Sequence, residues 1–501
     1  MADERKDFLD TVEEQIAYRP LRKKLSQELE AHILDRMEDY QEQGLPPKEA
    51  EAAAVRAMGD PVLVGTELNA VHQLQKAPAL MVLTLVLLLT GFAASAYMRW
   101  SPEQYANGFL YYIPGVLVLL LVSWKGYPLV IRHMRWLLPL AGALLLAGQI
   151  FSIRRWGVFW RIGYFRYFAL LLSGPFLILL AYRLRRRGGK TVLMILALCG
   201  ICILMPGFYG GGRDLPACAI LLISVTGALA LMIHRDIFGG DINARGRLYG
   251  ITLAGLALAA CLLGSTGHRR DLFQRFVDPD HNIDSTWDDT YNSALIRRLL
   301  SETPLAGGIE LTPQELMDYG TGAWYFAERD PRQIGIYGIH SEEEEQEFEA
   351  LVARIRESGG RPHYIYFNES DVTLWDILPQ HYHNNYRIAI CILLFGWLAG
   401  AVYLAVIGSF YLMMFGCIRK IQGRLAFSLA SCCGICLLAE GVFYILGNFG
   451  YQYASFTNLP LISEGRISVI VNMTLLGFIF SAYRYDHVEA GTDPSFCQLS
   501  S

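Results

Sequence analysis

Long apolar runs alternate with short basic loops over most of the chain. Each run approaches the length that a helix needs to cross about 30 Å of hydrocarbon. Inside lipid the backbone must satisfy its own polar groups, so helices are expected. We place the runs at residues 78–98, 108–124, 136–152, 167–183, 191–207, 216–233, 249–265, 388–416, 424–447 and 466–483. The pattern predicts an all-α integral membrane protein with about ten transmembrane helices.

The first 75 residues follow a different pattern. Apolar residues recur every fourth position from Leu21 to Met37, which predicts an amphipathic helix that ends at Gly44. A second helix is expected over 47–58, and a third begins at Asp60-Pro61. Together they predict a small helical bundle over residues 1–75, too short to bury a large core.

A polar interval over residues 267–386 separates the seventh predicted span from the eighth. Within it, 333–339 and 363–367 have the composition of strands, and Ser341 caps a helical pattern that ends at Gly359-Gly360. We therefore expect a small α/β insert in this long loop.

Basic residues set the expected orientation. Lysine and arginine concentrate at 125–135, 183–190, 235–247 and 419–424, in alternate loops. The positive-inside rule makes these loops cytoplasmic. The bundle 1–75 and the tail 486–501 are then cytoplasmic, and the loop 267–386 is extracytoplasmic. Transmembrane helices 1–7 fall in 76–266 and helices 8–10 in 387–485, in the plasma membrane of a cell.

Composition supports the membrane class and excludes others. Of 501 residues, 53% are hydrophobic and only 18% are charged. A net charge of -4 gives no argument for a nucleic-acid partner. Three of the ten cysteines, Cys432, Cys433 and Cys436, lie in one span without a nearby histidine, so packing is favoured over a metal site. No metal or other cofactor is predicted.

Charged residues inside or beside the spans are candidates for function, because charge in a bilayer is costly. Glu440 lies within the run 424–447, and Arg466 at a span end is a possible partner. One short outer loop also carries several basic and aromatic residues: Arg154, Arg155, Trp156 and Arg161. They either form an interfacial belt with snorkelling arginines or hold a lipid phosphate.

Four segments together resemble a known family. Residues 459–472, LPLISEGRISVIVN, are similar to the LPFISYGGSSLLAN segment of the SEDS family, the FtsW/RodA/SpoVE group. Residues 423–426, 154–163 and 276–279 also resemble segments of that family. The resemblance implies a ten-span bacterial protein that polymerises peptidoglycan from an undecaprenyl pyrophosphate-linked precursor, with a transpeptidase (penicillin-binding protein) as partner. It implies substrate contacts at Arg154, Arg155, Trp156, Arg161, Ser463, Ser468 and Asn472.

The N-terminal bundle carries a second resemblance. Glu28-Leu29, His32, Gly44 and 57–61 (AMGDP) are similar to the permease-prefix (HAAS-like) domain, which precedes membrane proteins of Gram-positive bacteria. That resemblance implies an interaction or regulatory module with a cytoplasmic partner, and no chemistry.

One departure from the family bears directly on catalysis. The family's catalytic aspartate precedes the eighth span, and here Asn385 stands at its position. An amide hydrogen-bonds but takes no proton from an attacking sugar hydroxyl, and loss of a general base costs about 100- to 10,000-fold in rate. Asp371, Asp376 and His383 are the nearby residues that could substitute.

The sequence therefore predicts a divergent SEDS-like membrane protein of cell-wall synthesis, cell shape or division, with glycosyltransferase activity lost or altered. Two alternatives stay open. One is a non-enzymatic sensor or scaffold for wall-synthesis partners, and the other is a transporter of the lipid-linked precursor.

Overall fold

The computed structural model describes residues 4–98, 102–151, 163–209, 214–264, 267–280, 283, 289–321, 323–326, 346, 373–379, 382–463 and 466–489. All regular elements in these ranges are helices. The strands predicted at 333–339 and 363–367, and most of the helix expected after Ser341, lie outside the described residues.

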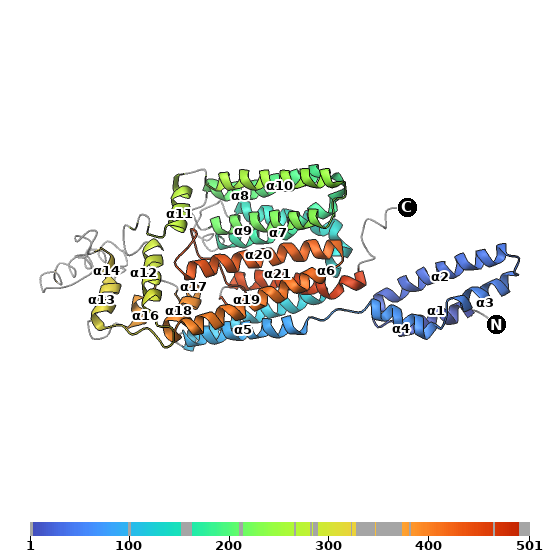
Figure 1. Cartoon of the computed structure of the whole chain (residues 1–501), viewed down its shortest axis with the longest axis horizontal. Coiled ribbons are helices and arrows are strands. Elements are labelled where there is room, and N and C mark those ends of the chain that lie inside the picture. Colours follow the sequence, from blue (N-terminus) through green and yellow to red (C-terminus); the bar gives the residue numbers. More distant parts are fainter. Residues whose placement is uncertain are drawn as a thin grey trace.

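Apolar helices lie side by side as one bundle (Figure 1). By length and composition, eight described helices can cross a membrane, so the chain is an all-α integral membrane protein. The bundle consists of α5 (Pro78–Tyr97), α6 (Pro102–Phe151), α7 (Gly163–Arg183), α8 (Gly189–Tyr209), α9 (Leu215–His234), α10 (Ile242–Leu263), α19 (Trp397–Lys420), α20 (Arg424–Asn448) and α21 (Arg466–Glu489). A short 3-10 helix, η2 (Arg185–Arg187), joins α7 to α8.

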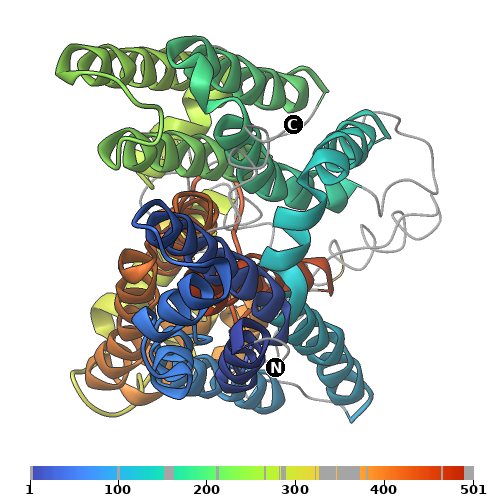
Figure 2. The same cartoon turned by 90° about the vertical axis from the view of Figure 1, so that its right-hand side faces the viewer.

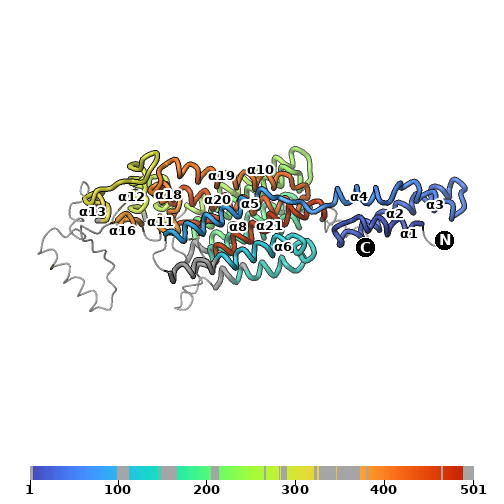
Figure 3. Tube along the Cα trace, turned by 90° about the horizontal axis from the view of Figure 1, so that it is seen from below, coloured from blue at the N-terminus to red at the C-terminus, as the bar shows by residue number. Residues whose placement is uncertain are grey.

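Helix α6 explains part of the difference from the ten predicted spans. Its 50 residues would extend about 75 Å if straight, yet its two halves both lie against the bundle. Gly115 packs on Val469 of α21, whereas Gly142 packs on Phe176 in the middle of α7. The helix therefore bends beyond Pro128, as prolines inside helices allow, and Figure 3 shows its tube turning back. The two apolar runs 108–124 and 136–152 belong to this one helix. The described apolar part of α8, Gly189–Leu204, is shorter than the rest.

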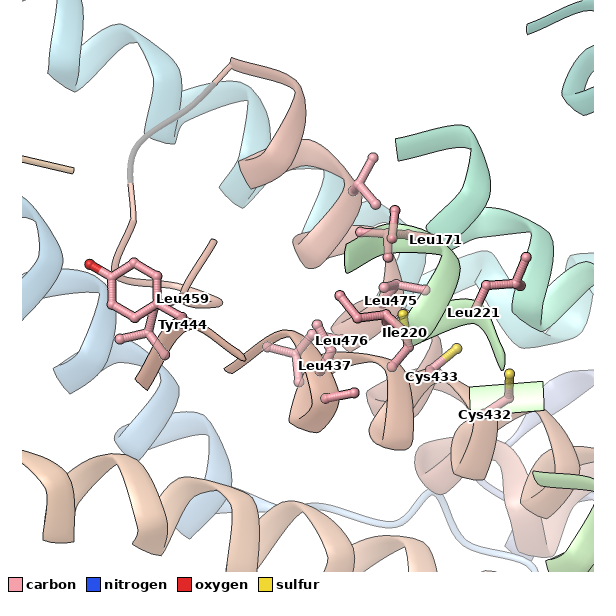
Figure 4. Packing of buried hydrophobic residues seen from close by; sticks show 14 of the residues in the cluster. Leu171, Ile220, Leu221, Cys432, Cys433, Leu437, Tyr444, Leu459, Leu475 and Leu476 are labelled. Atoms are coloured by element: carbon pink, nitrogen blue, oxygen red, sulfur yellow. The ribbon is translucent and has the colours of Figure 1, made fainter. Parts of the chain in front are cut away.

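The core of the bundle lies where α7, α9, α20 and α21 meet. Between 61% and 72% of the apolar window of each of these helices is buried by the rest of the protein, against 22% to 28% for α5, α10 and α19. Small residues allow close packing, as at Gly174, which approaches Ser224 and Cys432. Figure 4 shows Cys432 and Cys433 of α20 among leucines of this core and Ile220. The outer helices instead present leucine, valine and methionine side chains to lipid.

Four further helices form a module at one end of the bundle: α1 (Glu4–Gln15), α2 (Arg19–Glu42), α3 (Pro47–Ala57) and α4 (Pro61–Val71). Their apolar faces enclose a separate core that includes Val12, Ile16 and Ile33. Val488, at the end of α21, is buried in the same core, and the Nδ1 atom of His72 lies 3.0 Å from the carbonyl of His487. The module thus docks on α21, and Figure 2 shows it in front of the bundle.

The opposite end of the bundle, which we call the loop end, carries the described parts of the long loop. These are α11 (Gly267–Val277), α12 (Asp289–Glu302), α13 (Pro313–Thr321), α14 (Ala323–Phe326), α16 (Leu374–Ile377), α17 (Tyr382–Asn385) and α18 (Arg387–Phe395). Here Tyr291 and Tyr319 pack with Trp324. Burial, together with a hydrogen bond to Glu302, raises the pKa of Tyr319 to about 12.

Candidate functional site

Residues 382–389, which we call the return segment, bring the chain from the loop back into the bundle. They hold Asn385, the position where the SEDS resemblance expects an aspartate. The segment contains the single turn α17 and the start of α18, with Tyr386 between them. Two such short elements have little stability alone, so their position depends on side chains of neighbouring helices.

Asn448, at the end of α20, provides three of these connections and makes a fourth hydrogen bond within its own helix. Its Oδ1 accepts hydrogen bonds from the backbone amides of Ile388 at 3.0 Å and Ala389 at 3.1 Å. Its Nδ2 donates to the carbonyls of Asn385 and Tyr444, both at 2.9 Å. Asn448 has no exposed surface. Its amide therefore satisfies amides that the first turn of α18 leaves without a helical partner, and its full set of bonds fixes the segment to α20.

Arg387 ties the same segment to more distant parts of the chain. The guanidinium donates to the carbonyls of Gly91 at 2.8 Å and Ile462 at 2.6 Å, and to the Ser95 hydroxyl at 2.8 Å. Only 1% of this residue is exposed. Gly91 and Ser95 belong to α5, and Ile462 precedes α21, so one side chain links three parts of the bundle. Arginine suits this role because its planar fork presents several donors in fixed directions.

The predicted catalytic position lies on this fixed segment. The backbone carbonyls of Asn384 and Asn385 accept hydrogen bonds from Tyr444 and Asn448. The Asn385 side chain is half-buried and makes no hydrogen bond to the described residues. His383 is also half-buried, and its carbonyl accepts from the Nε of Arg387. Protein contacts thus hold the backbone at Asn384 and Asn385.

Asp376, one of the possible replacement bases, caps the short helix α16. Its Oδ2 accepts from the backbone amide of Thr373 at 2.8 Å and from the Thr373 hydroxyl at 2.6 Å. This is a capping box, with an aspartate in place of the usual glutamate. The carboxylate is exposed, and the structure places it in helix capping.

Helix α18 stops after Phe395, where the sequence pattern predicts one continuous span over 388–416. Gly396 takes φ 88° and ψ 172°, a conformation reserved for glycine. Residues 304–309, which we call the strap, lie across the break and bond its backbone. The amides of Trp397 and Leu398 donate to strap carbonyls, and strap amides donate to the carbonyls of Phe395 and Leu393. Irregular backbone inside a membrane protein requires such internal partners.

Deeper in the bundle, two of the other predicted residues lie together. Glu440 of α20 is fully buried, and Asn472 of α21 is 3% exposed. The two side chains lie beside each other, but neither carboxylate oxygen nor the Asn472 Oδ1 has a hydrogen-bond partner of good geometry among the described residues. Ser463 and Ser468 are buried too, and the Ser463 hydroxyl accepts from the amide of Leu459.

A buried ion pair at the loop end was missed by the sequence reasoning. Arg166, near the start of α7, donates from Nε and Nη2 to the carboxylate of Asp214, which precedes α9. They are 5% and 7% exposed. A signal was available, because α7 and α9 both begin at the same membrane face and each carries one charge beside its apolar run.

Several predicted residues are not placed. Arg154, Arg155, Trp156, Arg161 and Asp371 lie outside the described residues, as does the side chain of Arg466. The pairing of Glu440 with Arg466 therefore stays a prediction. In the part of the chain that the structure describes, no group of three histidine, cysteine, aspartate or glutamate residues could hold a metal ion.

Comparison with known proteins identifies one relevant fold. No family profile matches the sequence, and no curated protein matches it. Among solved structures, the chain is similar to a chain of a structure described as "Structural coordination of polymerization and crosslinking by a peptidoglycan synthase complex". The TM-score is 0.51 and the identity 14%, over 81% of this chain and 97% of that chain. The protein thus shares its fold with a chain of that structure.

Proposed function

We propose that this protein is a divergent, SEDS-like component of peptidoglycan synthesis, which binds an undecaprenyl pyrophosphate-linked precursor and has little or no polymerase activity. Two independent lines support the proposal. The fold is similar to a chain of a peptidoglycan synthase complex, and four segments of the sequence resemble the SEDS family in the same order. We expect a plasma-membrane location, with the loop end outside the cell.

The observation that carries the proposal is the state of Asn385. Polymerisation requires a sugar hydroxyl to attack an anomeric carbon as a lipid pyrophosphate leaves, and a carboxylate accepts the hydroxyl proton. Asn448 and Arg387 fix the return segment from two sides, so a side chain at 385 has a defined position. The amide there can donate to and accept from a sugar, but it cannot take the proton.

One of the candidate substitute bases, Asp376, already has a structural role. The carboxylate of Asp376 accepts two hydrogen bonds from Thr373 at the start of α16. If it moved to act as a base, α16 would lose its N-terminal cap. Retention of the binding framework without its base favours recognition of the precursor over its polymerisation. We assign the pyrophosphate contacts to Arg154, Arg155 and Arg161, where guanidinium groups suit phosphate oxygens.

A scaffold role is the second candidate, and the docking of the N-terminal module favours it. Tyr18 of the module packs on Tyr485 of α21, and the amide of Gln75 donates to the carbonyl of Arg484. A cytoplasmic partner bound to α1–α4 would therefore be linked through the module to α21, the helix that carries Ser468 and Asn472. A transpeptidase at the loop end would complete such an assembly.

The decisive experiment restores the missing carboxylate. Purified wild type, Asn385→Asp and the matched neighbour Asn384→Asp are incubated with fluorescent lipid II, with and without a transpeptidase, and glycan chains are separated by gel. We expect wild type to bind lipid II without forming chains, and Asn385→Asp to polymerise at least about 100-fold faster. Asn384→Asp should behave as wild type.

Two results would count against the proposal. Efficient polymerisation by wild type would mean that another group acts as the base. If neither wild type nor the two variants bound lipid II, the protein would not be a precursor-binding protein, and only the scaffold role would remain. An Arg154→Ala/Arg155→Ala protein tests the pyrophosphate contact in the same binding assay.

A further inference from the structure

The buried carboxylate of Glu440 has no counter-charge among the described residues. It lies in α20 with no exposed surface, and among the described residues neither of its oxygens has a hydrogen-bond partner of good geometry, although Asn472 and the backbone of Asn458 lie beside it. An ionised carboxylate without compensation is very costly in a low-dielectric interior. A buried carboxylate is stable in a membrane core only if a proton or another positive charge neutralises it.

The buried arginines of the bundle are engaged elsewhere. The guanidinium of Arg166 binds Asp214, and that of Arg387 binds the carbonyls of Gly91 and Ile462. Arg269, which is 7% exposed, donates to the carbonyl of Leu262. These contacts place each positive charge with oxygen partners other than Glu440.

The groups around Glu440 offer oxygen atoms. Asn472 of α21 and the backbone of Asn458 lie beside the carboxylate. Tyr167 and Tyr411 belong to α7 and α19, which both pack against α20. The Tyr167 hydroxyl and the Asn472 Oδ1 have no hydrogen-bond partner among the described residues. Tyr411 already donates to the carbonyl of Leu437, and Cys436 is the remaining titratable neighbour.

We propose that Glu440, Asn472 and Tyr167 form an intramembrane site for one monovalent cation, either a proton or an alkali metal ion. A carboxylate, an amide oxygen and a phenol oxygen are hard ligands that suit such ions. A single negative charge neutralises a monovalent ion, whereas a divalent ion would leave one positive charge uncompensated in the bilayer. This inference does not depend on the precursor-binding function.

Cation binding at this site would affect the stability of the loop end. The hydroxyl of Thr457 donates to the carbonyl of Glu440, and Thr457 belongs to the connection from α20 to α21. The same connection contains Ile462, whose carbonyl Arg387 holds. A bound cation would thus stabilise the α7–α20–α21 junction and, through this connection, the anchor of the return segment.

The test measures thermal unfolding of the full-length protein in detergent micelles, at fixed pH and ionic strength. Chloride salts of Na⁺, Li⁺ and K⁺ are compared with N-methyl-D-glucamine chloride. A melting temperature that rises saturably with one alkali ion in wild type, and not in Glu440→Gln, supports a metal ion. Asn472→Ala should raise the half-saturating concentration about tenfold, the effect of losing about 1.4 kcal/mol of binding.

The proton form is tested by infrared difference spectroscopy. If alkali ions have no effect, a carbonyl stretch of a protonated carboxyl group that disappears in Glu440→Gln supports a bound proton. The proposal is overturned if neither signal depends on Glu440. It is also overturned if Arg466→Gln destabilises the protein and the double Glu440→Gln/Arg466→Gln variant restores it, because Arg466 is then the counter-charge.

Discussion

Replacement of Asn448 by alanine should release the return segment. In the native protein its Oδ1 is the acceptor for the backbone amides of Ile388 and Ala389, two residues with no exposed surface. A buried donor left without a partner costs about 1–3 kcal/mol. Two such donors, partly rescued by water from the loop end, should lower the free energy of unfolding by about 2–5 kcal/mol, a large share of a typical total of about 5–15 kcal/mol.

Two measurements check this prediction. Equilibrium unfolding in mixed micelles gives the change in free energy, and hydrogen exchange of the backbone amides at 386–390 reports local release. Because the lost bonds are local, exchange should accelerate there before the rest of the bundle responds. In the lipid II assay, the same variant should also weaken binding if Asn385 contacts the precursor.

Matched variants separate the acceptor from general packing. Ser428→Ala removes a buried hydroxyl at the other end of α20, which bonds only to the carbonyl of Arg424, and should cost less than about 1 kcal/mol. Asn448→Asp keeps an acceptor, but it buries a charge and loses the donor that faces the carbonyls of Asn385 and Tyr444, so it should be at least as destabilising as Asn448→Ala. If Asn448→Ala matched Ser428→Ala in stability and left exchange at 386–390 unchanged, the anchoring role would be refuted.

Three further predictions follow from single contacts. Arg387→Met removes charge-assisted bonds worth about 1.5–3 kcal/mol each and should lower the melting temperature and expose the loop connections to protease; unchanged proteolysis would contradict it. Gly396→Ala puts a Cβ 2.8 Å from the Leu305 carbonyl in a conformation that costs about 1–3 kcal/mol, so it should unfold more easily than Gly408→Ala, which has open space. The amide and hydroxyl of Thr312 lower the pKa of Glu315. Its contribution to stability is thus present above the usual glutamate pKa and disappears as the pH falls through the lowered value; Glu315→Gln should flatten this dependence in thermal unfolding.

The membrane body is predictable from sequence because its signal is repeated and strong. Apolar runs of about 20 residues mark α5, α9 and α20 nearly to their ends, whereas α10 begins at Ile242, before the predicted 249. The break at Gly396 is not visible in this way, because the residues on both sides are apolar. Only the backbone partners from the strap, more than 85 residues earlier in the chain, explain why the helix stops there.

Of the residues in the candidate site, the sequence reveals those that differ from their neighbours in the chain, but not those whose role depends on other helices. Glu440 stands out in an apolar run and is indeed fully buried. Asn448 and Arg387 were not selected as anchors, since their importance comes from the elements that surround them rather than from local spacing. Asp376 could have been recognised, because the spacing of Thr373 and Asp376 fits a capping box. Arg166 and Asp214 each stand beside an apolar run at the same membrane face, which gave a signal for a pair, but only the packing of α7 against α9 shows that they bind each other.

The strap has a consequence for the biosynthesis of the protein. Residues 304–309 are translated before α18 and α19, so the bonding partners of the break already exist when those helices leave the insertion machinery. Until the strap docks, the amides of Trp397 and Leu398 have no carbonyl to bond, and lipid offers none. Correct insertion of α18 and α19 should therefore require that α12 and the strap fold first. In this way the long loop would assist the assembly of the helix bundle.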